Sequence, residues 1–177
     1  VYKMTTRRKT HTVKVGSLFI GGDAPITVQS MTKTPTHDID ATLKQIYDLQ
    51  QAGCDIVRCA VPDDRAAEAL GEIRVNIQIP LVADIHFNAK YAMMALEQGV
   101  DKLRLNPGNL KDERKIAEIV AAAKERSVPI RIGVNAGSLD SKIRERFGGV
   151  CPEAMVASAQ EEVELLERLD FHDIVIS

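Results

Sequence analysis

The stretches Ala52-Gly-Cys-Asp-Ile-Val-Arg58 and Gln98-Gly-Val-Asp-Lys-Leu-Arg104 are two copies of one pattern, and this repeat decides the fold class. Each copy ends a helical periodicity on Gly, places Asp two residues later and places Arg three residues after the Asp. Each copy then continues as a short aliphatic run, which is typical of a strand buried in a parallel sheet. Recurrence of such a unit favours a (β/α)8 barrel, because these barrels repeat one βα unit.

Short strand-like runs and longer helical patterns alternate on both sides of this repeat. The expected strands are 26–31, 55–60, 81–86, 102–106, 130–135 and 173–176. Asp40, Asp63 and Asn88 are the expected N-caps of the first three helices, and two more helices are expected at 111–126 and 153–169. The alternation predicts a parallel sheet that is covered by helices and joined by right-handed crossovers.

The predicted barrel is incomplete. A TIM (β/α)8 barrel needs eight βα units and about 250 residues, whereas this chain offers about five units plus a sixth strand within 177 residues. A short β-hairpin is expected first, with runs at 13–15 and 18–20. We therefore expect an N-terminal segment at 1–22 and a partial barrel domain at 23–177. An open doubly wound sheet is the alternative, weakened because no G-x-G-x-x-G follows the first strand.

Composition and charge narrow the function classes. The net charge is −2 and 45% of the residues are hydrophobic, which is ordinary for a globular protein and gives no basic field for nucleic acid. No apolar run approaches the roughly 18–20 residues of a membrane span, so neither nucleic acid nor membrane is an expected partner. The three cysteines show no C-x-x-C spacing, which favours reduced thiols in a cytoplasmic protein and leaves the roles of Cys54, Cys59 and Cys151 unassigned.

Polar residues interrupt four strands that would otherwise be continuous aliphatic runs. Residues two apart in a strand share a face, so Asp84 lies on the side of His86, and Arg104 on the side of Asn106. The aliphatic residues suit the helix-covered face, and the polar residues therefore face the barrel axis near the C-terminal strand ends. The inward polar set is Arg58, Asp84, His86, Arg104, Asn106, Arg131 and Asn135.

Three inward arginines predict a polyanionic ligand, which we interpret as a phosphate or diphosphate ester. Guanidinium groups match phosphate geometry and stay charged. The turn at 106–109 adds backbone N–H groups that suit an anion. A single arginine is more often a structural ion-pair partner, but the one carboxylate of Asp84 cannot neutralise three of them. A second interpretation of Asp84 and His86 together is a pair of metal ligands. A second interpretation of His86 alone is a histidine of the core.

Five motifs in order along the chain resemble the 4-hydroxy-3-methylbut-2-enyl diphosphate synthase family. They are Val28-Gln-Ser-Met-Thr-Lys-Thr, Ala52-Gly-Cys-Asp-Ile-Val-Arg58, Pro80-Leu-Val-Ala-Asp-Ile-His-Phe87, Lys102-Leu-Arg-Leu-Asn-Pro-Gly-Asn109 and Ile130-Arg-Ile-Gly-Val-Asn-Ala-Gly-Ser138. The resemblance implies a barrel followed by a smaller domain with a [4Fe–4S] cluster, whose ligands lie outside this chain. It also implies reductive ring opening and dehydroxylation of 2-C-methyl-D-erythritol 2,4-cyclodiphosphate, with flavodoxin or ferredoxin as the electron donor.

The resemblance also assigns roles to the inward polar set. It implies that Arg58, Arg104, Arg131 and Asn135 hold the diphosphate. The residues beside the reacting carbons would be Asp84, His86 and Asn106. It further implies a homodimer at full length, a cytoplasmic or plastid-stroma location, and an inactive fragment with no cluster of its own.

Two rival functions remain open at the level of sequence. A dihydropteroate-synthase-like barrel enzyme also binds anionic ligands at its strand ends. A non-catalytic phosphate-binding module would use the same arginines without chemistry. The segment 136–152 is longer than most βα loops and suits either a mobile cover or an ordinary surface excursion.

Overall fold

The computed structural model describes residues 8–86, 88–105 and 112–177. Its strands are β1 (Val13–Val15), β2 (Leu18–Ile20), β3 (Gln29–Met31), β4 (Ile56–Ala60), β5 (Leu81–Asp84), β6 (Lys102–Leu105), β7 (Ile130–Ile132) and β8 (Ile174–Ile176). Its helices are α1 (Ile39–Gln51), α2 (Asp64–Val75), α3 (Ala89–Glu97), α4 (Glu113–Glu125), α5 (Ser141–Arg146) and α6 (Pro152–Arg168).

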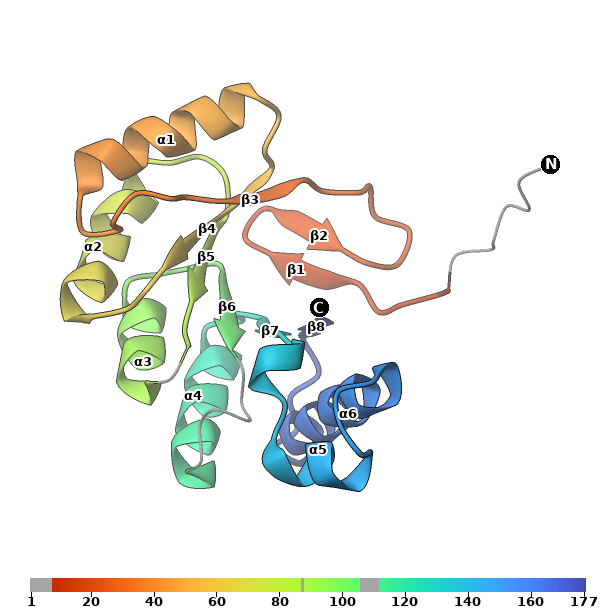
Figure 1. Cartoon of the computed structure of the whole chain (residues 1–177). Coiled ribbons are helices and arrows are strands. Elements are labelled where there is room, and N and C mark those ends of the chain that lie inside the picture. Colours follow the sequence, from red (N-terminus) through yellow and green to blue (C-terminus); the bar gives the residue numbers. More distant parts are fainter. Residues whose placement is uncertain (1–7, 87, 106–111) are drawn as a thin grey trace.

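The strands form a curved parallel sheet of six, in the order β3-β4-β5-β6-β7-β8, and β1 pairs with β2 as an antiparallel hairpin. Figure 1 shows helices α2, α3 and α4 side by side along one face of this sheet, with the hairpin on the other face. Sequential order with parallel pairing throughout is the arrangement of a (β/α)8 barrel that lacks its last strands. The predicted partial TIM barrel with a preceding hairpin is confirmed.

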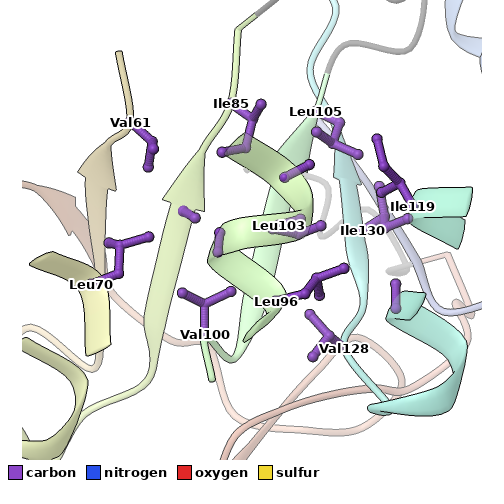
Figure 2. Close-up of a cluster of buried hydrophobic side chains, with 14 of the residues drawn as sticks. Val61, Leu70, Ile85, Leu96, Val100, Leu103, Leu105, Ile119, Val128 and Ile130 are labelled. Carbon is purple, nitrogen blue, oxygen red and sulfur yellow. The ribbon is translucent and has the colours of Figure 1, made fainter. Parts of the chain in front are cut away.

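The helix-covered face of the sheet forms the main hydrophobic core. Figure 2 shows side chains from β6 and its neighbours meeting those of α2, α3 and α4. Leu103 and Ile130 are paired in register and fully buried, and Ile85 is 1% exposed. Strict alternation along each strand sends these aliphatic side chains outward and leaves the opposite face for other residues.

Two of the three predicted helix caps are confirmed and one is wrong. The side chains of Asp63 and Asn88 accept hydrogen bonds from backbone N–H groups at the starts of α2 and α3. For α1 the cap is Asp38, not Asp40. A turn closed by the Asp38 N–H on the Pro35 carbonyl starts the helix earlier, so that Asp40 lies inside its first turn.

The repeated Gly-x-Asp pattern has a structural explanation. In both copies the glycine adopts a positive φ at the end of the helix. The Asp55 carboxylate then accepts a hydrogen bond from the Val28 N–H (2.7 Å), and Asp101 accepts one from the Leu81 N–H (2.8 Å). Each aspartate thereby ties its strand to the backbone of the neighbouring strand and fixes the register of the arginine three residues on.

The hairpin closes the N-terminal end of the sheet's inner face. Val15 of β1 packs against Ile56 and Val82, and all three are fully buried. At the hairpin turn, Gly16 has a φ of +56° and lies so near the β6 start that a Cβ there would be 2.7 Å from an Asp101 carboxylate oxygen. Only glycine suits this close approach with a positive φ. The interior is therefore sealed with apolar side chains at this end.

Strands β7 and β3 are shorter than expected. β7 ends at Ile132 instead of continuing to 135, and β3 likewise starts at Gln29 instead of 26. The segment 136–152 contains a 3-10 turn and the short helix α5, and its residues Leu139 and Ile143 form a small core with Ala154 of α6. This local core is what an ordered surface excursion requires. Of the helices in the described ranges, none is long and apolar enough to cross a membrane.

Candidate anion-binding site

The strand register brings the predicted polar residues onto one face in two layers. Asp84 pairs with Arg104, and Arg104 pairs with Arg131, so these three side chains point into the barrel at one level. One level nearer the hairpin, Arg58 pairs with Met31 on one side and Val82 on the other. Paired residues of a parallel sheet point to the same side, which is the physical basis of the sequence prediction.

Asp84 is the hub of this cluster, and its side chain is only 3% exposed. Its carboxylate lies 3.5 Å from Arg58 Nε and 3.3 Å from Arg104 Nη1. His86 Nε2 lies 3.4 Å from the same carboxylate. A buried carboxylate between two guanidinium groups is compensated, and it holds both arginines in place along the inner wall.

Positive charge exceeds negative charge at this site. Arg58 also donates to the Met31 sulfur at 3.0 and 3.2 Å, a weak acceptor that carries no formal charge. Arg131 is half-buried, and no ion pair of it occurs within the part of the chain that the structure describes. Burial and the guanidinium groups of Arg58 and Arg104 lower its pKa, and Asp84 opposes this. Buried positive charge without a counter-charge is costly, so the site favours an anion.

A glycine makes room for one of the arginines. Gly133 follows β7, and a Cβ built there would be 2.5 Å from both Nε and Nη2 of Arg104. The Arg104 guanidinium therefore lies directly against the backbone of the neighbouring strand end. Any larger residue at position 133 would displace this guanidinium, which explains the glycine in an otherwise aliphatic run.

Lys102 is a charged residue of the site that the sequence prediction missed. It lies on β6 two residues before Arg104, so it shares the inner face, and it is only 1% exposed. Its Nζ donates to Gln29 Oε1 on β3 at 3.0 Å, across the inside of the sheet. Burial, then Arg131 and Arg58, lower the pKa of Lys102 to about 8. The i, i+2 spacing to Arg104 was the signal that could have identified it.

Three predicted site residues lie at the margin of this cluster or beyond it. His86 follows the end of β5, with a side chain 49% exposed, and reaches back to Asp84. Asn135 is exposed beyond β7, and its Oδ1 accepts a hydrogen bond from the Gly137 N–H at 3.1 Å. Asn106 lies outside the described residues. The roles of Asn106 and Asn135 stay predictions.

The cysteines do not offer a cluster site. Cys54 and Cys59 are buried, and burial raises the pKa of Cys59 to about 11, so this thiol stays protonated. The Cys151 sulfur accepts a hydrogen bond from the Ala154 N–H and caps α6. Within 8–86, 88–105 and 112–177 no three His, Cys, Asp or Glu side chains come together as metal ligands. The cysteines in these ranges therefore do not fit a [4Fe–4S] cluster, and no third His, Cys, Asp or Glu of these ranges joins Asp84 and His86.

Comparison with known proteins agrees with the motifs. A family model, the GcpE TIM-barrel domain, matches residues 10–177. The chain belongs to this family. It is 58% identical over 171 residues to a protein from Geobacillus thermodenitrificans and 55% identical over 171 residues to one from Clostridium tetani. Both relatives carry the name 4-hydroxy-3-methylbut-2-en-1-yl diphosphate synthase (flavodoxin).

The chain spans about half the length of the curated relatives that it matches. The alignments cover 97% of this chain but only 46% of the Geobacillus protein and 49% of the Clostridium protein.

Among solved structures, dihydropteroate synthases share the fold. The Yersinia pestis enzyme gives a TM-score of 0.62 at 12% identity over 93% of this chain and 61% of that chain. The Vibrio fischeri enzyme gives 0.62 at 12% identity over 94% and 66%. At such low identity the likeness shows the barrel fold alone. The family match favours the 4-hydroxy-3-methylbut-2-enyl diphosphate synthase interpretation over the dihydropteroate-synthase alternative.

Proposed function

We propose that this chain is the substrate-holding barrel of a 4-hydroxy-3-methylbut-2-en-1-yl diphosphate synthase. The full-length protein would open the ring of 2-C-methyl-D-erythritol 2,4-cyclodiphosphate reductively and release one hydroxyl as water. The observation that carries the proposal is the arginine layer, the inward side chains of Arg58, Arg104 and Arg131 on two adjacent levels, with Asp84 as the carboxylate at its centre. The names of relatives at 54–58% identity support the same reaction.

The arginine layer would bind the diphosphate. Asp84 holds two of the three guanidinium groups at 3.3 and 3.5 Å, so their positions are set before the ligand arrives. Preorganised donors of this kind lose little conformational entropy on binding. Binding both phosphates places the carbon skeleton of the substrate toward the open C-terminal mouth, where His86 lies.

His86 is the proposed proton donor to the departing hydroxyl. Its imidazole is half-exposed at the rim and lies 3.4 Å from Asp84, which orients it. Asn106 and Asn135 would complete the pocket, Asn106 beside the reacting carbons and Asn135 at the diphosphate. The chain's own contribution is thus to bind, orient and deliver a proton.

The remaining parts of the reaction would come from outside this chain. We propose that the electrons come from flavodoxin or ferredoxin through a [4Fe–4S] cluster, whose ligands belong to the rest of the protein. The proposed assembly is a homodimer in the cytoplasm. This barrel segment by itself would bind no cluster and would not turn over substrate.

The test is substrate binding and turnover by the full-length protein, purified without oxygen. Arg104→Ala should weaken cyclodiphosphate binding by about 1.5–3 kcal/mol, the scale of a lost charged hydrogen bond. The matched control is Arg126→Ala, because Arg126 follows α4 and contacts Glu125 and the Ala122 carbonyl, away from the site. Unchanged binding by a folded Arg104→Ala variant would contradict the proposed pocket.

Turnover then distinguishes the synthase from its rivals. Formation of the allylic diphosphate should track the iron and sulfide content of the wild-type protein. A fully loaded cluster without product would point to another substrate. Anion binding without any cluster would favour the phosphate-binding module, and binding of a pterin would favour the dihydropteroate-synthase-like enzyme.

A further inference from the structure

A buried lysine crosses the barrel interior on the inner face of the sheet. Lys102 extends from β6 to Gln29 on β3, and this hydrogen bond joins strands that are not neighbours in the sheet. The lysine pairs in register with Val82, next to which lies Arg58. Lys102 therefore stands at the level of Arg58, one level nearer the hairpin than Arg104 and Arg131.

The surroundings of this amine are cationic. Arg58 faces it from β4 and Arg131 from β7, Arg104 stands two residues further along β6, and Asp84 of β5 is the carboxylate of the cluster. The inward residues of β3 are Gln29 and Met31, and those of the hairpin core are apolar. In the described chain Lys102 has a neutral amide oxygen as its hydrogen-bond partner, so its positive charge is poorly compensated while the site holds no anion.

We propose that Lys102 is a positioning residue of the anion site that takes up a proton when a diphosphate binds above it. The added charge stabilises the bound anion from below, and the bond to Gln29 fixes where that charge lies. This inference rests on the proposed function, because it requires a diphosphate at the arginine layer. It adds a fourth cationic group, level with Arg58 and one level deeper than Arg104 and Arg131.

The pH range of the effect follows from the site without ligand. Burial and the neighbouring arginines lower the pKa of Lys102 to about 8, so the amine loses its proton as the pH rises from 7 to 9. A bound dianion favours the protonated form and raises this pKa. By linkage, binding then takes up protons, and affinity falls as the pH rises from 7 to 9, by at most about tenfold.

The experiment is isothermal titration calorimetry of the full-length protein with the cyclodiphosphate, without reductant so that no turnover occurs. Each phosphate of this ligand has one ester link and one anhydride link within the ring, so its one acidic oxygen is fully ionised across the range and the ligand contributes no titration. Measurements at pH 7 and pH 9, in buffers of different ionisation enthalpy, give the affinity and the number of protons taken up. Wild-type protein should take up several tenths of a proton at pH 9.

The matched variant is Lys102→Met, which keeps the length and removes the amine. We expect it to bind more weakly at pH 7, with no pH-dependent loss of affinity and no proton uptake at pH 9. Lys102→Arg should restore a charge that does not titrate, and its affinity should be the same at both pH values. A purely structural role for the lysine would give no such difference between the variants in proton uptake.

Two failures are distinguishable. If wild-type protein does not bind the cyclodiphosphate and Arg104→Ala changes nothing, the proposed function itself fails. If wild-type protein binds, Arg104→Ala weakens binding, and proton uptake at pH 9 is zero or equal in Lys102→Met, the role of Lys102 is wrong and the arginine site stands. If Lys102→Met does not fold, the same comparison of proton uptake is made with Lys102→Arg, which should also take up none at pH 9.

Discussion

Adjacent residues of β6 point to opposite faces of the sheet and lie in different surroundings. Leu103 points outward into the helix-covered core and is fully buried among aliphatic side chains. Arg104 and Lys102, its neighbours in sequence, point inward and are buried among charges. The outer face gains free energy from removal of apolar surface from water. The inner face carries buried charge that costs free energy until a counter-charge arrives.

This difference indicates that the outer face determines the free energy of unfolding and the inner face determines the anion affinity. Substitution on the outer face should change the free energy of unfolding and leave anion affinity alone. Substitution on the inner face should change affinity, and at Lys102 it should raise stability. Three substitutions test this division, and a fourth tests the helix cap.

The largest expected effect is on the outer face. Leu103→Ala removes a fully buried side chain and leaves a cavity between β6 and the helices, which should cost about 3–4 kcal/mol of unfolding free energy. Denaturant unfolding of the full-length protein measures this cost. Leu103→Met is the control and should lose less than about 1.5 kcal/mol. A large change in cyclodiphosphate affinity for a folded Leu103→Met variant would break the division between the faces.

The next largest effect is expected at Lys102 on the inner face. The pKa of Lys102 in the folded state is about 8, below its value in an unfolded chain, so the unfolded chain binds more protons between these values. Folded stability therefore rises as the pH rises through this range, and charge burial is most costly at pH 7. Lys102→Met should be more stable than wild type by roughly 2 kcal/mol at pH 7. This advantage should shrink by pH 10, as followed by unfolding at each pH, and an advantage independent of pH would contradict it.

A smaller effect is expected at the glycine beside Arg104. Gly133→Ala places a methyl group where the guanidinium lies, so the side chain must move. Because the end of an arginine is flexible, we expect little loss of stability but a loss of anion affinity of roughly 1 kcal/mol. Gly71→Ala is the control, since a Cβ at this residue of α2 would be 2.0 Å from the flexible end of the Gln98 side chain, away from the anion site. Equal affinities for both variants would show that the contact with Gly133 does not position Arg104.

The smallest effect tests the helix cap. Asp38→Ala removes the acceptor for the Ala41 N–H and should lower the unfolding free energy by about 1 kcal/mol. Asp40→Ala changes only a residue in the first turn and should cost about half of that or less. Thermal unfolding of the two variants compares them directly. A greater cost for Asp40→Ala would restore the cap that the sequence suggested.

Most of the fold was predictable because local patterns and sheet geometry agree. Alternation along each strand assigned Arg58, Asp84 and Arg104 to one face, and the structure brings them together. Parallel pairing then placed Arg131 beside Arg104. These predictions needed only the period of a strand and the order of the strands.

What the sequence did not predict depends on contacts between distant segments. Lys102 looks like the polar start of a strand, and its burial involves Gln29 of β3, far from it in sequence. β7 is shorter than predicted, although the Gly133 and Val134 N–H groups still bond to neighbouring carbonyls, and the turn closed by Asn135 comes only after them. Asp38 displaced Asp40 as the cap because the Pro35 turn starts α1 two residues sooner.

The tie made by Asp55 and Asp101 has a consequence for how such chains can vary. Each carboxylate accepts a hydrogen bond from the backbone of the previous strand. This bond fixes the strand register, and with it the face of the sheet to which the arginine three residues later points. Insertion of one residue between the aspartate and the arginine would turn the guanidinium toward the helices. The connecting loops can lengthen without this effect. Homologous barrels that bind the same ligand should therefore keep the three-residue spacing between the aspartate and the arginine.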